Sequence, residues 1–158
     1  MTASTDTGEH VLRKALEISG QRFTEQRAAV YRFLAGTDSH PTADDVFLQV
    51  RSELPGISLA TVYKSLETLV GCGLASKLTC GDGCARYDGR TDPHHHVRCL
   101  TCGRVSDVPT QESESEMRWL QAAPRGYRVV GYRLLLEGYC DACDGGAPDS
   151  ATSGPARA

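Results

Sequence analysis

The stretch from Pro93 to Cys102, Pro-His-His-His-Val-Arg-Cys-Leu-Thr-Cys, holds three of the five histidines and two of the seven cysteines in the chain. A second Cys-x-x-Cys pair, Cys140 and Cys143, follows further along the chain. Because two thiolates at this spacing can bind one ion, the two pairs predict a tetrahedral zinc site. Its ligands would be Cys99, Cys102, Cys140 and Cys143. Four sulfur ligands leave no open position, so we expect the zinc to be structural.

The alternatives for these cysteines are two disulfides or free buried thiols. The first residues, Met1 to Glu9, are polar and lack the apolar region of a secretory signal. Seven cysteines is an odd number, and without a signal metal binding is favoured over a disulfide framework. No apolar run approaches the ~18 residues of a membrane helix. We therefore expect a cytoplasmic protein that does not enter the membrane.

The histidines suggest a second metal site. If the chain is extended here, His94 and His96 point to the same side and His95 points to the other. Asp88 lies on a predicted strand just upstream, and Asp107 follows the first cysteine pair. Imidazole and carboxylate ligands without a thiolate favour Fe(II) or Mn(II). The alternative is a solvated histidine-rich loop with ordinary surface carboxylates.

Helical periodicity predicts four helices in the first half of the chain. They are Glu9–Gly20, a second helix capped by Thr24 and ended by Gly36, a third capped by Thr42, and a fourth over Ser58–Val70. Two strands then follow, Leu74–Thr79 and Ala85–Asp88, with a glycine-rich turn between them. Helices followed by a hairpin predict a winged helix-turn-helix, and the alternative is a small helical bundle.

The fourth helix has one apolar side and one polar side. Its apolar stripe is Leu59, Val62, Leu66 and Leu69. The other side offers Ser58, Ala60, Thr61, Tyr63, Lys64 and Ser65. Small residues let a helix approach the major groove, and Lys and Tyr side chains reach phosphates or base edges. Since the net charge is −3, DNA contact would have to come from such a local face.

The second half predicts a small α/β unit. Strands are expected around Val97, Val105 and Val108 and over Tyr127–Leu136, with a helix at Gln111–Ala122 between them. The apolar run Leu134–Leu136 is typical of a buried strand. A unit of roughly 60 residues is near the lower limit for a self-sufficient core, so a zinc ion and dimerisation would both stabilise it.

The predicted fold class is α+β. The predicted divisions are a disordered tail at 1–8, a winged-helix DNA-binding domain at 9–88, an α/β dimerisation and metal-binding domain at 89–143, and a disordered tail at 144–158.

Several of these motifs together resemble the ferric uptake regulator family. They are Ser58-Leu-Ala-Thr-Val-Tyr63, Tyr87-Asp88, His94-x-His96-x-x-Cys99-x-x-Cys102-Gly103 and Cys140-x-x-Cys143. The resemblance implies a homodimeric metalloregulator of transcription, with a winged helix that binds an AT-rich inverted-repeat operator. It also implies a regulatory metal between the domains. Carried over by motif, the ligands of that metal would be His40, Asp88, His94, His96 and Asp107.

Aspartate at both acidic positions, Asp88 and Asp107, is most similar to the peroxide-sensing members of the family. In these, Fe(II) catalyses oxidation of a ligand histidine, for which His40 and His94 are the expected targets. Tyr132 stands where the family has an extra regulatory histidine. An iron sensor stays open as an alternative, and Cys84, near Asp88, keeps a zinc sensor open.

Cys72, Cys80 and Cys84 match no ligand position; they are read as packing or incidental thiols, and Cys80 with Cys84 could form a redox pair. Two other function classes stay open. A metal-dependent hydrolase could use His94, His96 and an aspartate, but no general base or oxyanion motif lies beside them, so we expect no enzyme. A zinc-stapled interaction module without DNA binding is the other.

Overall fold

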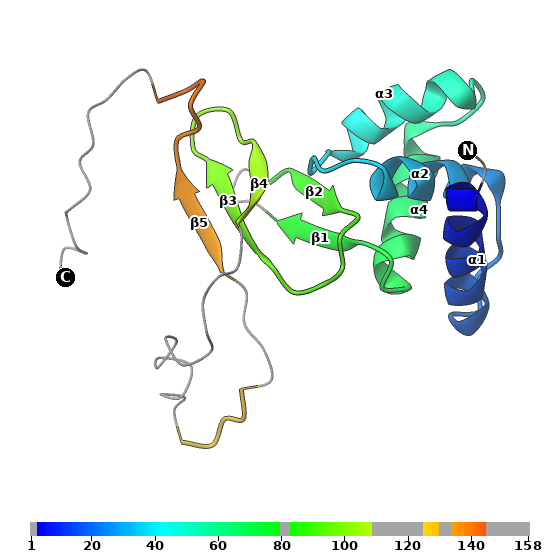
Figure 1. Cartoon of the computed structure of the whole chain (residues 1–158), viewed down its shortest axis with the longest axis horizontal. Coiled ribbons are helices and arrows are strands. Elements are labelled where there is room, and N and C mark those ends of the chain that lie inside the picture. The colour runs from blue at the N-terminus through cyan, green and yellow to red at the C-terminus, as the bar shows by residue number, and fades with distance from the viewer. Residues whose placement is uncertain (1–2, 80–82, 109–124, 130–133, 145–158) are drawn as a thin grey trace. The chain divides into compact units, whose positions relative to one another are not determined.

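The computed structural model describes residues 3–79, 83–108, 125–129 and 134–144 (Figure 1). The chain forms two compact units, Met1–Pro93 and His94–Ala158, which we call the N-terminal unit and the C-terminal unit. The N-terminal unit thus includes residues 89–93, which follow the last strand of the predicted DNA-binding domain. Within the described ranges, no helix has both the length and the apolar character that crossing a membrane requires.

The N-terminal unit consists of four helices followed by a hairpin (Figure 1). The helices are α1 (Ala3–Ile18), α2 (Glu25–Ala35), α3 (Ala43–Glu53) and α4 (Leu59–Gly71). The hairpin is β1 (Ser76–Thr79) and β2 (Ala85–Asp88), antiparallel and in a register that pairs the first residue of β1 with the last of β2. This confirms the predicted winged helix-turn-helix.

Helices α2 and α3 begin at the predicted N-caps, and α4 is capped by Ser58, which was predicted to open that helix. Thr24, Thr42 and Ser58 each accept a hydrogen bond from the backbone N–H three residues on, so each satisfies a donor that the helix leaves unpaired. The prediction fails at α1, which begins at Ala3, so the expected disordered tail at 1–8 is wrong from that residue onward. An ion pair of 2.7 Å between Arg13 and Glu9, one turn apart, supports the early part of this helix.

One core serves the four helices and the hairpin. Its largest fully buried side chains are Leu12, Leu16, Val30, Leu34, Val46, Val62, Leu66, Leu69 and Tyr87. The apolar stripe predicted on α4 accounts for three of these, while Leu59, the fourth member, is only half-buried. Tyr87 brings strand β2 into the same core, so the hairpin is fixed to the helices by packing.

The described residues of the C-terminal unit form a sheet of three strands in the order β4-β3-β5. Strand β3 (His95–Cys99) pairs antiparallel with β4 (Val105–Val108) and parallel with β5 (Leu135–Gly138). The predicted strand at Tyr127–Leu136 is wrong in its first part, because residues 127–129 form no strand. The buried strand expected at Leu134–Leu136 is also wrong, because Leu135 and Leu136 are 40% and 42% exposed in the single chain. Among the described strands, β5 lies at the edge of the sheet.

Several predictions fall on residues outside the described ranges. They are the helix at Gln111–Ala122, the positions Cys80 and Tyr132, and the tail beyond Asp144.

Candidate metal centres

The backbone of the C-terminal unit brings the two cysteine pairs together. Cys99 ends β3, and its N–H donates to the carbonyl of Arg104, which closes the turn that carries Cys102. Since β5 runs parallel to β3, the N–H of Leu100 donates to the carbonyl of Gly138, two residues before Cys140. The chain then turns, and the N–H of Cys143 donates to the carbonyl of Cys140.

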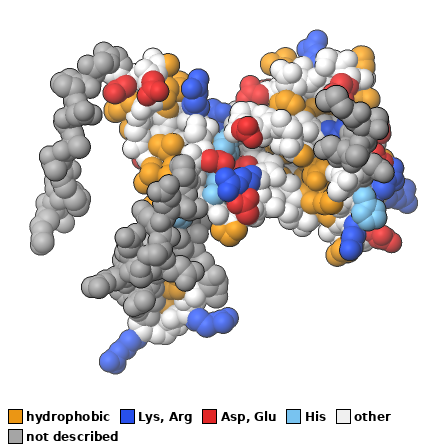
Figure 2. Space-filling view, viewed as in Figure 1, with side chains coloured by type: hydrophobic (Ala, Val, Ile, Leu, Met, Phe, Trp, Pro, Cys, Tyr) orange, Lys and Arg blue, Asp and Glu red, His pale blue; other side chains and the backbone are white. Residues whose placement is uncertain are grey.

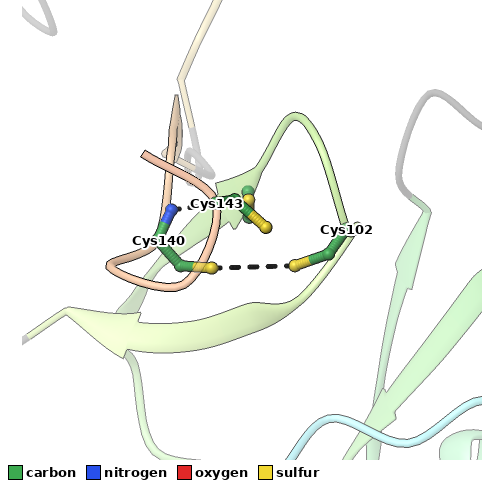
Figure 3. A group of neighbouring side chains, drawn as sticks. Cys102, Cys140 and Cys143 are labelled. Atoms are coloured by element: carbon green, nitrogen blue, oxygen red, sulfur yellow. Dashed lines mark hydrogen bonds between the residues drawn. The ribbon is translucent and has the colours of Figure 1, made fainter. Parts of the chain in front are cut away.

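The four sulfur atoms lie within 4.8 Å of one another. Figure 3 shows Cys102, Cys140 and Cys143 gathered between the turn after β3 and the segment after β5. The Sγ atoms of Cys102 and Cys140 are 3.7 Å apart. Two sulfurs on one tetrahedral zinc, with bonds of about 2.3 Å, are separated by about 3.8 Å, whereas a disulfide brings them to about 2.0 Å. None of these four cysteines forms a disulfide. The spacing therefore fits the predicted zinc site.

Backbone donors prepare one thiol of this cluster for ligation. The N–H groups of Cys102 and then Cys140 lower the pKa of Cys99 to about 6, because they stabilise its thiolate. Hydrogen bonds shared with the other thiols, first with that of Cys140, raise the pKa of Cys143 to about 12. Binding of a metal at neutral pH must therefore displace protons from the cluster.

The C-terminal unit also gathers two histidines and one carboxylate. Oδ1 of Asp107 lies 3.3 Å from Nε2 of His94 and 3.8 Å from Nε2 of His96. Two ligands of one ion, with bonds of about 2.0–2.2 Å, lie about 3.0–3.6 Å apart, so these atoms are close to ligand spacing. The sheet register sets this geometry, since His96 on β3 faces Asp107 on β4.

These histidines are nearly enclosed. The side chains of His94 and His96 are 4% and 11% exposed, and that of Asp107 is 32% exposed. The ring centroids of His94 and His96 lie 4.4 Å apart, and the angle between the two ring planes is 59°. Alternation along β3 directs His95 to the other face of the sheet, as the sequence predicts.

The N-terminal unit holds the other two predicted ligands as a buried pair. Nε2 of His40 lies 3.8 Å from Oδ2 of Asp88, and the two side chains are 2% and 7% exposed. The other carboxylate oxygen of Asp88, Oδ1, accepts a hydrogen bond of 2.7 Å from the N–H of Arg90. Asp88 therefore presents Oδ2 toward the imidazole.

Backbone contacts join the segment around His40 to strand β2. The N–H of Tyr87 donates to the carbonyl of Pro41 at 2.9 Å, and the guanidinium of Arg86 donates to the carbonyl of His40 at 3.0 Å. The sequence reading missed Arg86. No motif could have revealed it, because its partner is a carbonyl 46 residues away.

The polar side of α4 is exposed as predicted at Ser58, Ala60, Tyr63 and Lys64, and Thr61 is half-buried. Ser58 and Thr61 are also engaged in the helix cap, their hydroxyls 2.8 Å apart. Ser65 was wrongly placed on this side. Ser65 is only 3% exposed, because it follows Val62 by one helical turn and lies on the buried side of α4. Its hydroxyl donates to the carbonyl of Thr61. On the face in Figure 2, acidic and basic side chains are interspersed.

A family model described as the ferric uptake regulator family matches residues 18–137 of the chain. The chain is 36% identical to the peroxide operon regulator of Bacillus subtilis over 137 residues, which cover 85% of this chain and 94% of that protein. It is 32% identical to the peroxide-responsive repressor PerR of Staphylococcus epidermidis over 146 residues, covering 90% of this chain and 97% of that one.

Among solved structures, the chain is similar to the ferric uptake regulator of Pseudomonas aeruginosa with manganese. The TM-score is 0.64 at 26% identity, and the match covers 85% of this chain and 98% of that one. Because the family model spans most of the sequence and the relatives match over nearly their whole length, this chain belongs to the ferric uptake regulator family.

Proposed function

We propose that this chain is a metal-dependent transcriptional repressor that senses peroxide. The observation that carries the proposal is the donor set: buried imidazoles lie beside the aspartate carboxylates Asp88 and Asp107, with no thiolate among them. The second support is sequence similarity, since the chain is 36% and 32% identical to two regulators named for peroxide.

The regulatory ion takes its ligands from both units in this proposal. The N-terminal unit supplies His40 and Asp88, and the C-terminal unit supplies His94, His96 and Asp107. Nitrogen and oxygen donors of this kind suit Fe(II) and Mn(II). His40 and Asp88 lie on the unit that carries α4, so an ion shared by the two units would favour the arrangement that binds DNA. An ion shifts that equilibrium only by its difference in affinity for the two arrangements.

The second ion is zinc, held by Cys99, Cys102, Cys140 and Cys143. Its support is the sulfur spacing, which is that of a closed tetrahedral site. Its role is structural, since four thiolates leave no position for a substrate or water.

DNA is contacted by the exposed side of α4 in this proposal. Ser58, Ala60, Thr61, Tyr63 and Lys64 are the contact residues, and the operator is an AT-rich inverted repeat read by a homodimer in the cytoplasm. A palindromic site matches a twofold-symmetric protein. With a net charge of −3, binding depends on this local face and weakens as salt rises.

Peroxide sensing follows from the metal in the site. Bound Fe(II) supplies the redox chemistry, whose net result is transfer of one oxygen atom from H₂O₂ to a ligand imidazole with release of water. His40 and His94 are the proposed targets. An oxidised imidazole is a poorer ligand, so the site loosens and the repressor leaves DNA. Mn(II) fills the same site without this chemistry.

The test uses zinc-loaded protein, reloaded anaerobically with Fe(II) or with Mn(II) as the matched control. Each sample is bound to a labelled inverted-repeat duplex and given stoichiometric peroxide, and anisotropy and peptide mass are followed together. We expect release only with Fe(II), with one oxygen added at His40 or His94. Retention in both samples with unmodified histidines would contradict peroxide sensing, and absence of DNA binding with any metal would contradict the repressor.

A further inference from the structure

A buried tyrosine joins the metal-bearing strand to the DNA-facing helix. Tyr87 lies on β2, is 1% exposed, and its hydroxyl donates to Oε1 of Glu67 at 3.0 Å. Glu67 belongs to α4 and follows Tyr63 and Lys64 by about one helical turn, so it lies on the same side of the helix as those two residues. The tyrosine hydroxyl therefore ends at the side of α4 that is proposed to face DNA.

The backbone of Tyr87 is fixed at the opposite end, beside the buried His40 and Asp88 pair. Its N–H donates to the carbonyl of Pro41, the residue after His40. Asp88 is the next residue along the strand. A movement of Asp88 toward or away from His40 must therefore move the backbone of Tyr87.

The charges make this hydrogen bond directional at neutral pH. A tyrosine hydroxyl keeps its proton at neutral pH, so the hydroxyl of Tyr87 acts as the donor. The ammonium of Lys77, 2.6 Å from the same carboxylate oxygen, lowers the pKa of Glu67, which stays charged and acts as the acceptor. Lys77 lies on β1, which carries no proposed metal ligand.

We propose that Tyr87 is a positioning residue that couples occupancy of the regulatory site at Asp88 to the DNA-facing side of α4 through Glu67. The proposal rests on the proposed function, since it assumes that an ion at Asp88 promotes DNA binding. When the ligand pair closes, the tyrosine hydroxyl holds Glu67 in place, and the turn that carries Tyr63 and Lys64 is held with it. When the pair opens, this restraint is lost.

The experiment measures coupling in the full-length, zinc-loaded protein. The dissociation constant for an inverted-repeat duplex is determined with saturating Mn(II) and again without Mn(II), and the ratio of the two constants is the coupling. Allosteric couplings are typically about 5- to 150-fold, so we expect Tyr87→Phe to reduce the ratio by about fivefold or more. Linkage requires the gain in Mn(II) affinity caused by DNA to fall by the same factor.

Three further variants separate coupling from a merely structural effect. Glu67→Leu removes the acceptor of the hydrogen bond and should reduce the ratio as Tyr87→Phe does. Because the side chain of Glu67 is half-exposed, this variant tests the same bond without a change in the buried core. Glu67→Gln keeps an oxygen that can accept the tyrosine hydrogen bond, so it should retain the coupling. Lys77→Met removes the other partner of the carboxylate and should also retain it. Any general change in attraction to DNA cancels in the ratio.

The outcomes are distinguishable. Loss of coupling in Tyr87→Phe and Glu67→Leu, with retention in Glu67→Gln and Lys77→Met, supports the proposal. A ratio within twofold of the parent in Tyr87→Phe or in Glu67→Leu overturns it and leaves the proposed repressor intact. A parent protein whose DNA affinity does not respond to Mn(II) overturns both.

Discussion

At the scale of single residues, Asp107 is the least enclosed member of its cluster. One of its carboxylate oxygens lies close to two histidine nitrogens, at 3.3 and 3.8 Å. A side chain one methylene longer would move this oxygen or force the carboxylate to turn. If Asp107 is a ligand as proposed, the position of its carboxylate, and not its charge alone, decides how it would bind an ion.

The substitution Asp107→Glu should weaken the peroxide response while metal-dependent binding to DNA persists. The carboxylate can still reach an ion, but the geometry that exposes the ion to peroxide changes. We expect release from DNA by peroxide to slow by about tenfold or more, since misplacement of a reacting group by about 1 Å can cost 100-fold. Anisotropy of the Fe(II) protein on its duplex measures this rate.

The matched control is Asp44→Glu, the same change at an exposed position in the first turn of α3. It should release DNA at the parental rate. A parental rate in Asp107→Glu as well would contradict the role of Asp107.

At this scale the sequence singled out the residues that the structure gathers into two clusters, but not the residues that contact them. Cys-x-x-Cys and His-x-His are local patterns whose chemistry depends on residue type and spacing, so Cys99 and His96 could be singled out directly. Arg86 and Glu67 act through partners far along the chain, at distances of 46 and 20 residues. Such contacts arise only when the fold brings the elements together.

At the scale of elements, the end of β2 is pressed against the end of α2. A Cβ atom placed on Gly89 would overlap the carbonyl oxygen of Leu34 and would lie 2.8 Å from the carbonyl carbon of the same residue. Both are backbone atoms and cannot turn away as a side chain could. Glycine at this position lets the strand, with Asp88 as its last residue, approach the helix closely.

Gly89→Ala should therefore destabilise the N-terminal unit and loosen the His40 and Asp88 pair. Overpacking of this kind costs about 1–3 kcal/mol. Mn(II) affinity should fall with it, measured by titration, and stability is measured by urea unfolding. Gly71→Ala is the control, because a Cβ at that position meets nothing within 4 Å. Equal stability and equal Mn(II) affinity in the two variants would contradict this account.

Helix α3 begins with a capping box. The hydroxyl of Thr42 accepts from the N–H of Asp45, and the carboxylate of Asp45 accepts from the N–H of Thr42 at 2.9 Å. Thr42→Ala should cost about 1 kcal/mol of unfolding free energy, the usual value of an N-cap. Urea unfolding at neutral pH checks this. Asp44→Asn, in the same turn but outside the box, should cost clearly less.

The same box gives an acid limb to the stability profile. The backbone and then the hydroxyl of Thr42 lower the pKa of Asp45 below its ordinary value of 3.8. Stability from this bond is therefore present above pH 3.8 and is lost as the pH falls through the lower pKa of the folded state. Asp45→Asn should flatten this limb in unfolding curves taken from pH 5 downward. An unchanged slope would contradict the contribution of the box.

The prediction of helices and strands succeeded where hydrogen bonds between residues close in sequence determine the structure. It failed where burial depends on packing against residues distant in sequence. The predicted caps Thr24 and Thr42 gave the starts of α2 and α3, because capping is a local hydrogen bond. The leucine run at β5 is typical of a buried strand, yet Leu135 and Leu136 are 40% and 42% exposed, on a strand at the edge of the sheet that the described residues form. An apolar run indicates that a surface is favourable to bury, but it does not indicate whether the residues that bury it belong to the same chain.

At the scale of the whole molecule, the two units are stabilised differently. The N-terminal unit has a shared core of leucine, valine and alanine side chains from all four helices. In the described part of the C-terminal unit, the buried hydrophobic residues are Cys99 and Val105, and Cys99 is one of the four proposed zinc ligands. A sheet with so little buried apolar surface depends on other sources of stability. The thiolate cluster supplies one, because binding free energy of a structural zinc is folding free energy.

Removal of zinc should therefore unfold the C-terminal unit and leave the N-terminal unit folded. A structural zinc contributes about 10–16 kcal/mol, as much as the whole stability of a typical domain, so its loss exceeds what the small sheet can tolerate. Hydrogen exchange after treatment with a strong chelator checks this: amides of β3 and β5 should lose protection, while those of α2 and α4 keep it. Cys143→Ser should behave like the chelated protein, and Cys84→Ser, an exposed cysteine outside the cluster, should behave like the parent. If β3 amides stay protected after complete loss of zinc, the cluster is not what holds this unit together.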